Sequence, residues 1–137
     1  MFKPDDYRKL RVLIVEDQPF IRQIVRGMLR KLGFDDIIEA GDGQEGMAAL
    51  FRRLPDLIIC DIQMKPMGGL QFLEATRKAD DQRVNRIPFL FLTSQDDETT
   101  IKAALGSGVD GYLLKPVAQD ALQARIDAAL KAVVRRD

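Results

Sequence analysis

The sequence predicts an α/β fold in which a doubly wound, five-stranded parallel sheet is covered by five helices. Two observations lead to this prediction: short apolar segments alternate five times with segments of helical spacing, and the apolar segments are continuous. Continuous apolar strands are typical of a parallel sheet that is buried on both faces. Right-handed crossovers leave few topologies for this order, and a doubly wound sheet is the natural one.

The first half of the chain contains three of the predicted strands and two of the helices. We expect the strands over residues 11–15, 37–40 and 57–61. The first helix begins at Pro19, because proline is favoured at the first helical position, and it ends at Gly33. The second helix follows a glycine-rich turn, in which Asp42 can cap the helix N-terminus.

The second half of the chain contains the other two strands and three helices. We expect the strands over residues 87–93 and 111–115, and the helices over residues 69–78, 98–105 and 117–134. The acidic pair Asp96 and Asp97 suits the N-terminus of the helix that follows it. Residues 79–86 are predicted to form a polar loop. Residues 1–10 form an N-terminal extension, either a flexible tail or a segment that packs on the sheet edge.

Composition argues against several classes of function. Lys plus Arg and Asp plus Glu are balanced at 21 each, and this balance disfavours a nucleic-acid-binding domain. The chain shows no signal peptide and no membrane-spanning segment, and its single cysteine, Cys60, lies in an apolar run. We therefore expect a cytoplasmic protein without a membrane partner, and the small size favours a monomer. Because the chain has no histidine, any phosphohistidine must belong to a partner.

Polar side chains with compatible chemistry follow four of the predicted strands. Glu16 and Asp17 end the first strand and Asp61 ends the third. Thr93 ends the fourth strand and Lys115 ends the fifth. The carboxyl ends of parallel strands share one edge, so these residues converge, and the three carboxylates need cations to offset their repulsion. Hard oxygen ligands without His or Cys suit Mg²⁺, and such a site is suited to phosphoryl transfer onto Asp61.

Taken singly, each of these residues has an ordinary structural explanation. Glu16 and Asp17 could form a solvated turn before a helix, and Asp61 could hydrogen-bond the turn after its strand. Thr93 could cap a helix, and Lys115 could be a surface lysine. The functional interpretation is favoured because four independent strand ends bring the right chemistry to one edge.

Four motifs together resemble the receiver domain of bacterial two-component response regulators, in the single-domain form typified by the chemotaxis response regulator. They are V-L-I-V-E-D, L-I-I-C-D-I-Q-M-K-P-M-G-G-L, F-L-F-L-T-S and G-Y-L-L-K-P. The resemblance covers residues 9–134 and implies a flavodoxin-like sheet in the order 2-1-3-4-5. The domain boundaries it implies are an extension over residues 1–10 and a receiver domain over residues 11–134, with no output domain.

The resemblance also implies how the acidic residues act. Asp61 would accept a phosphoryl group from a sensor histidine kinase or a phosphotransfer protein. Asp17 and Asp61 would bind Mg²⁺ through their side chains. The backbone carbonyl of Gln63 would complete the site, and Glu16 would act through water. The protein would then be no enzyme beyond its own phosphorylation and dephosphorylation.

The remaining implied residues connect phosphorylation to an output surface. Lys115 would pair with the phosphoryl group, and its peptide bond to Pro116 is expected to be cis. Thr93 would move toward the phosphoryl group while Tyr112 swings inward. This would alter a surface formed by the fourth helix, the fifth strand and the fifth helix, which binds a downstream protein. By itself, Tyr112 could equally be an ordinary strand aromatic.

Three positions depart from the family pattern. Glu16 stands where Asp is commoner. The loop after Asp61 reads M-K-P-M where many members read M-P-x-M, so that Lys65 is near the site, and Gly68 replaces a frequent Asp. These differences concern the conformation of the loop and the choice of kinase.

The sequence is also compatible with three other classes of function. One is a constitutive scaffold that keeps the receiver fold without phosphorylation, which the intact acidic residues and Lys115 disfavour. Another is a phosphatase that works through an aspartyl phosphate, but Gln63 stands where such an enzyme usually needs a second Asp. A flavin-binding protein of similar topology is the third, and the chain lacks an evident phosphate-cradling loop for it.

Overall fold

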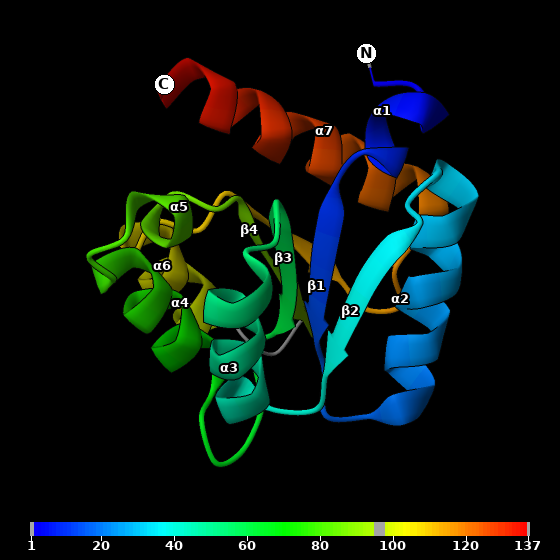
Figure 1. Ribbon diagram of the computed structural model, residues 1–137. Coiled ribbons are helices and arrows are strands. Elements are labelled where there is room, and N and C mark those ends of the chain that lie inside the picture. The colour runs from blue at the N-terminus through cyan, green and yellow to red at the C-terminus, as the bar shows by residue number, and fades with distance from the viewer. Residues whose placement is uncertain (1, 95–97, 137) are drawn as a thin grey trace.

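A five-stranded parallel sheet forms the centre of the molecule (Figure 1). This computed structural model describes residues 2–94 and 98–136, with side chains in that range up to residue 131. The strands are β1 (Arg11–Val15), β2 (Asp36–Ala40), β3 (Leu57–Asp61), β4 (Phe89–Thr93) and β5 (Gly111–Leu114). Their order is β2-β1-β3-β4-β5, and all neighbours pair in parallel. The predicted doubly wound sheet and its order are confirmed.

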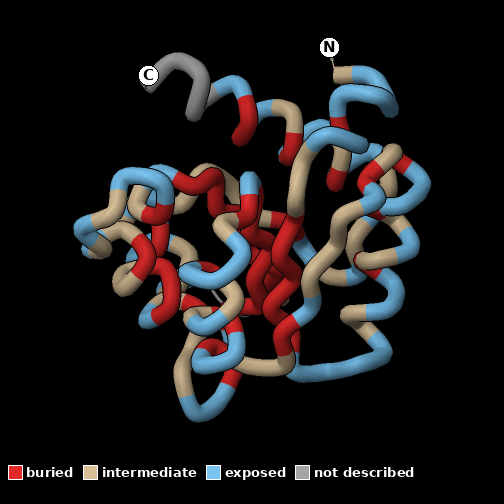
Figure 2. Tube along the Cα trace, in the orientation of Figure 1, coloured by how far each residue is buried: buried red, intermediate tan, exposed pale blue. Residues whose placement is uncertain are grey.

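Helices cover both faces of the sheet. One face packs against α2 (Pro19–Leu32) and α7 (Gln119–Arg136), and the other against α3 (Gly43–Arg53), α4 (Gly69–Lys78) and α6 (Glu98–Gly106). Alternate strand residues enter the two cores because successive side chains point to opposite faces: Val12 and Ile14 face α2, whereas Leu13 and Val15 face α3. Figure 2 shows the central strands β1, β3 and β4 almost wholly buried, whereas the edge strand β2 is mostly intermediate or exposed.

Local signals in the sequence set the helix ends as expected. Pro19 is the first residue of α2, and Gly33 ends it with φ 127°, a left-handed conformation that favours glycine. A side chain at Gly33 would also collide with the backbone of Pro4. The Asp42 carboxylate accepts a hydrogen bond from the Glu45 N–H of 2.9 Å and so caps α3.

Several boundaries differ from the sequence prediction. The prediction of a loop over residues 79–86 is wrong for α5 (Gln82–Asn85), which Asp81 caps by accepting a hydrogen bond from the Arg83 N–H. Four residues are too few to show helical periodicity. Strand β4 and helix α7 each begin two residues later than expected, and β2 begins one residue earlier. The predicted capping pair Asp96 and Asp97 lies outside the described residues.

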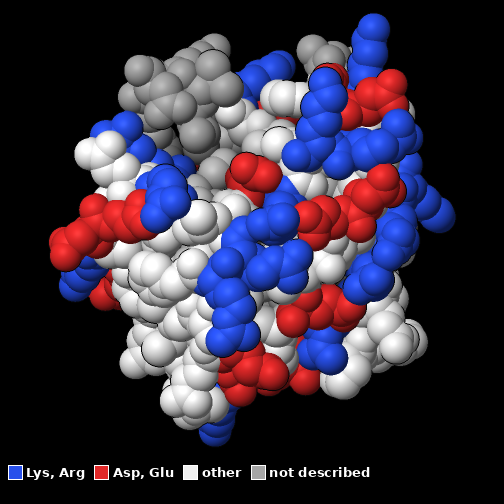
Figure 3. All heavy atoms as spheres, in the orientation of Figure 1, with Lys and Arg blue, Asp and Glu red and all other residues white. Residues whose placement is uncertain are grey.

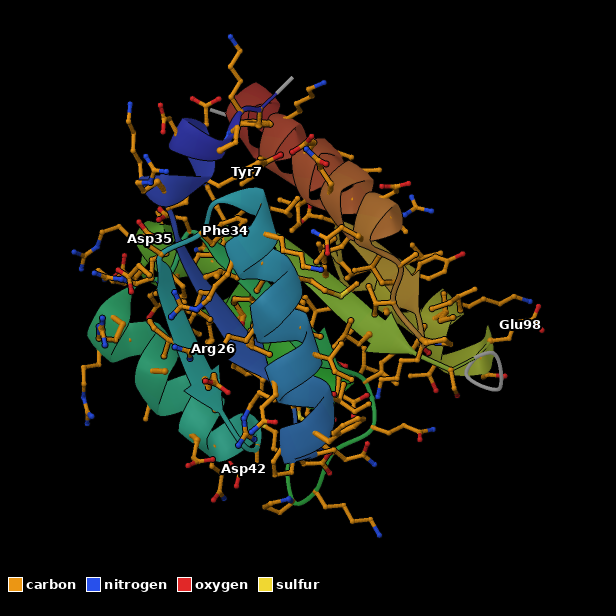
Figure 4. All side chains as sticks on the ribbon, turned by 90° about the vertical axis from the view of Figure 1, so that its right-hand side faces the viewer. Tyr7, Arg26, Phe34, Asp35, Asp42 and Glu98 are labelled. Atoms are coloured by element: carbon orange, nitrogen blue, oxygen red, sulfur yellow. The ribbon has the colours of Figure 1, made fainter. Side chains whose placement is uncertain are left out.

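The N-terminal extension forms a short helix, α1 (Pro4–Arg8), which packs on α7 and the end of α2. Tyr7 is buried there, and its hydroxyl donates a hydrogen bond of 2.6 Å to Asp127 on α7. Its ring packs on Phe34 with a centroid distance of 5.1 Å. Figure 4 shows Tyr7 and Phe34 beside α7 and the end of α2. The N-terminal extension is therefore a packed segment and not a flexible tail, but it packs on helices and not on the sheet edge.

Ion pairs line the edge strand β2. The pairs are Arg11–Asp36, Arg53–Asp36, Arg22–Glu39 and Arg26–Glu39. On the face seen in Figure 3, basic and acidic side chains alternate along this side of the molecule. Within the part of the chain that the structure describes, no helix is long and apolar enough to span a membrane.

The environment of Tyr7 generates a prediction about alkaline pH. Burial and the hydrogen bond to Asp127 raise the pKa of Tyr7 from 10.0 to about 12. The unfolded chain loses this proton near pH 10, so the free energy of unfolding should fall as the pH rises from about 10 to about 12. The chain has two tyrosines and no tryptophan, so tyrosinate absorbance can be assigned by substitution.

In the absorbance titration of the wild type, we expect Tyr7 to lose its proton near pH 12, and we expect this component to be absent in Tyr7→Phe. Tyr7→Phe should also lower the melting temperature at pH 7, because Asp127 loses its donor. Tyr112→Phe is the control and should leave the component near pH 12 in place. A Tyr7 component that titrates near pH 10 would contradict this account.

Candidate functional site

Three acidic side chains meet at the carboxyl edge of the sheet. Glu16 and Asp17 follow β1, and Asp61 is the last residue of the adjacent strand β3. One carboxylate oxygen from each lies within 4.8 Å of the others. Glu16 and Asp61 are buried, whereas Asp17 is exposed. The convergence predicted from the strand order is therefore observed.

Lys115 brings a positive charge to the same cluster. Its Nζ lies 3.1 Å from Asp61 Oδ1 and 3.6 Å from Glu16 Oε2. The Lys115 N–H donates to the Thr93 carbonyl at 2.8 Å, which extends the β4–β5 ladder by one residue. The side chain thus starts beyond the end of β5 and reaches across the end of β4. The expected cis peptide bond between Lys115 and Pro116 is present.

Glu16 carries the strongest electrostatic perturbation in the cluster. Its side chain is fully buried, and among the described residues its Oε2 has no hydrogen-bond partner. Burial, followed by the charge of Asp61, raises the pKa of Glu16 from 4.5 to about 7, although the Lys115 charge and the Gln18 N–H oppose the shift. The single positive charge of Lys115 therefore does not balance the negative charge of the three carboxylates.

The donor set fits Mg²⁺. It consists of hard carboxylate oxygens with an orphaned buried oxygen among them, and it includes an exposed member, Asp17, on the solvent side. Cys60 does not join it, because its thiol is buried and donates to the Asp61 carbonyl. The Gln63 N–H donates to Asp61 Oδ1 at 3.3 Å, which holds the start of the next loop against the site. The Gln63 carbonyl as a metal ligand stays a prediction.

Thr93 and Tyr112 lie on the neighbouring strands β4 and β5, with Tyr112 farther from the carboxyl edge. Thr93 is buried at the end of β4, one residue beyond the partner of Asp61 in the β3–β4 register, and its hydroxyl donates to the Ser94 carbonyl at 3.1 Å. Tyr112 is half-buried in β5, with the Arg125 guanidinium of α7 5.8 Å from its ring centre. Thr93 thus belongs to the site edge, whereas Tyr112 packs against the core on the face of the sheet that α3, α4 and α6 cover.

The loop over residues 62–68 is held by close contacts that sequence analysis did not identify. A side chain on Gly69 would lie 2.4 Å from the Asp61 carbonyl, so only glycine allows α4 to start this close to β3. A side chain on Gly43 would collide with Met67, which packs on the start of α3. The glycine pair after the third strand is the signal in the sequence that points to such a close approach.

This loop also borders a pocket next to the acidic cluster. The pocket has a volume of about 470 Å³ and is lined by Asp17, Ile62, Gln63, Met64 and Lys65. Lys65 lines this pocket and so lies near the site, as expected. It is exposed, and its peptide bond to Pro66 is cis.

Comparison with known proteins agrees with this geometry. The family model of the response regulator receiver domain matches residues 12–127. The chain belongs to this family. Receiver domains are not classical enzymes, so the phosphatase and flavin alternatives lose their support. The acidic cluster of Glu16, Asp17 and Asp61 is consistent with the phosphorylation site of a receiver.

Two chemotaxis proteins and one solved response regulator are similar to the chain over almost their full length. The chain is 34% identical to the probable chemotaxis protein CheY of Rhizobium etli, covering 91% of this chain and 95% of that protein. It is 32% identical to the chemotaxis protein CheY of Pseudomonas aeruginosa, covering 90% and 98%. A crystal structure of a putative response regulator from Chloroflexus aurantiacus superimposes with a TM-score of 0.82 at 27% identity, covering 89% and 98%. This receiver is therefore similar to chemotaxis regulators.

The burial of Glu16 generates a prediction about stability. In chelator at pH 8, we expect Glu16→Gln to raise the free energy of unfolding by roughly 1 to 2 kcal/mol, because it removes a buried charge that lacks a full set of donors. The raised pKa means that the folded state binds more protons than the unfolded state between pH 4.5 and about 7. The gain should therefore shrink as the pH falls from 8 to 5.

Chemical denaturation measures this effect, and the exposed neighbour Asp17 supplies the control. Asp17→Asn should change the stability in chelator by less than Glu16→Gln does, because its carboxylate is solvated. Glu16→Gln destabilising the metal-free protein at pH 8 would contradict the electrostatic account of the cluster.

Proposed function

We propose that this receiver accepts a phosphoryl group on Asp61 from a phosphohistidine of a sensor kinase or phosphotransfer protein, and that phosphorylation alters a protein-binding surface on α6, β5 and α7. The observation that supports this most directly is the distance of 3.1 Å between Lys115 Nζ and Asp61 Oδ1 inside the acidic cluster. The chain has no histidine of its own, so the donor belongs to a partner.

The transfer needs only displacement at phosphorus. An Asp61 oxygen forms a bond to phosphorus as the bond from phosphorus to the partner's imidazole nitrogen breaks, and the imidazole keeps that electron pair and takes up a proton. Lys115 pairs with the phosphoryl oxygens, and the Thr93 hydroxyl donates to one of them. Mg²⁺, held by Asp17, Asp61 and the Gln63 carbonyl with Glu16 acting through water, supplies further charge neutralisation when bound.

The switch depends on contacts that differ between the two states. The Thr93 hydroxyl donates to the Ser94 carbonyl in this structure, so bonding to a phosphoryl oxygen instead would shift the chain after β4. Tyr112, which packs against the same core as α6, follows this shift by moving inward. Leu105 on α6 and Leu114 on β5 are 57% and 44% exposed, and they offer apolar contacts to a protein target.

The setting we propose is that of a monomer in the cytoplasm. The thiol of Cys60 is free and buried, as in proteins of reducing compartments. The balanced charge favours a protein target over a nucleic acid.

Incubation with acetyl phosphate and Mg²⁺, followed by intact mass measurement, tests the acceptor. We expect one phosphoryl adduct, which is absent in Asp61→Asn and in the presence of a chelator. Asp56→Asn is the matched control, because Asp56 immediately precedes β3, at the end opposite Asp61, and accepts a hydrogen bond from the Arg11 N–H. It should be phosphorylated like the wild type.

A wild type without an adduct at saturating donor would favour the scaffold alternative. Turnover of unrelated phosphomonoesters would favour a phosphatase.

Amide spectra of the free and beryllofluoride-loaded protein test the switch. We expect shifts in α6, β5 and α7 of the wild type, and their loss in Thr93→Val, which keeps the buried volume but removes the hydroxyl. Shifts confined to the loop at residues 62–68 in the wild type would show that the output surface does not respond.

A further inference from the structure

Arg22 on α2 connects the turn after β1 with the edge strand β2. Its Nη1 donates a hydrogen bond of 2.7 Å to the backbone carbonyl of Glu16. Its Nε donates a bond of 3.0 Å to Glu39 Oε1 on β2. The Arg22 side chain is only 22% exposed, and the two bonds hold the planar guanidinium in one orientation.

The Glu16 carbonyl lies where the β1–β2 ladder ends. The Glu16 N–H donates to the Ala40 carbonyl at 3.0 Å, which is the last bond of this ladder. Beyond Ala40 the strand ends, and the Gly41 N–H turns away to donate to the Glu45 carboxylate. Arg22 thus supplies the donor that a longer β2 would supply, and Glu16 is held through both its N–H and its carbonyl.

We infer that Arg22 is a positioning residue for the metal site. By holding the Glu16 carbonyl it determines the direction in which Glu16 and Asp17 leave the end of β1 and enter the acidic cluster. Glu39 fixes Arg22 in turn, in the way that outer partners orient metal ligands. This inference rests on the proposed function, in which Glu16 and Asp17 contribute to Mg²⁺ binding.

The charge of Arg22 has an effect of the opposite sign. A guanidinium near the cluster repels a cation, so an arginine that acted by charge alone would weaken Mg²⁺ binding, and its removal would strengthen binding. An arginine that positions the ligands strengthens binding, and its removal would weaken it. The direction of the change in affinity therefore separates the two roles.

Arg26 provides a matched control one helical turn later. It forms an ion pair with the other carboxylate oxygen of Glu39, and Figure 4 shows it between α2 and β2. Among the contacts of the described residues, Arg26 bonds to Glu39 but not to Glu16. Substituting Arg26 removes an ion pair with Glu39 but leaves the hydrogen bond to the Glu16 carbonyl in place.

Titration calorimetry of Mg²⁺ binding at pH 8, with melting in chelator as a second readout, tests the inference. We expect Arg22→Ala to weaken Mg²⁺ binding about 10-fold and Arg26→Ala to leave it within about twofold. Both should lower the melting temperature, because each loses an ion pair with Glu39, and Arg22→Ala should lower it more because it also loses the bond to the Glu16 carbonyl. Arg22→Lys keeps the charge but not the planar pair of donors, so it should fall between the wild type and Arg22→Ala.

Mg²⁺ binding by the wild type distinguishes a failure of this inference alone from a failure of the proposed function. If the wild type binds Mg²⁺ and Arg22→Ala binds it equally or more tightly, Arg22 does not position the ligands. If the wild type binds no Mg²⁺, the proposed function and this inference both fail. Should Arg22→Ala not fold, Glu39→Gln is the second variant, because it keeps the bond between Arg22 and the Glu16 carbonyl but removes the carboxylate that holds Arg22. Glu39→Gln should weaken Mg²⁺ binding by a smaller factor. Unchanged Mg²⁺ binding in both Glu39→Gln and Arg22→Lys would overturn the inference.

Discussion

Two buried carboxylates, Glu16 and Asp61, lie at the carboxyl ends of adjacent strands with the Lys115 ammonium within 3.6 Å of both. The acids cannot separate without disrupting the sheet, so their repulsion has to be offset by positive charge. Lysine alone does not suffice, since Glu16 keeps a buried oxygen without a donor and a pKa near 7. This local deficit explains why the edge favours a divalent cation, and the proposed chemistry at Asp61 depends on it.

The surrounding structure holds this charged cluster in a rigid frame. Strand β3 is buried along its whole length, and Gly69 lets the following helix start against the Asp61 carbonyl. At the end of β1, Arg22 supplies a donor that the short edge strand β2 lacks. The exposed apolar side chains of α6 and β5 lie outside this frame, where a change at the site can reach a partner.

Sequence reasoning identified the cluster because parallel strands place their carboxyl ends together. It also placed Pro19, Gly33 and Asp42 at helix ends, where each residue acts through its own backbone or its nearest neighbours. It did not identify α5, whose four residues show no period, or the packing of α1. The packing of α1 depends on Tyr7 meeting Asp127, and no local pattern encodes a contact between residues 120 positions apart.

By itself, the sequence determined the class of fold, the order of the elements and the acidic character of the site, because these follow from local periodicity and from residue types at strand ends. Only the tertiary structure decided that Glu16 is fully buried while Asp17 is exposed, and that Lys115 reaches both Glu16 and Asp61. It alone showed that Arg22 bonds to the Glu16 carbonyl. Burial, pKa and hydrogen-bond partners depend on distances between elements, and those distances exist only once the sheet and its helices have packed.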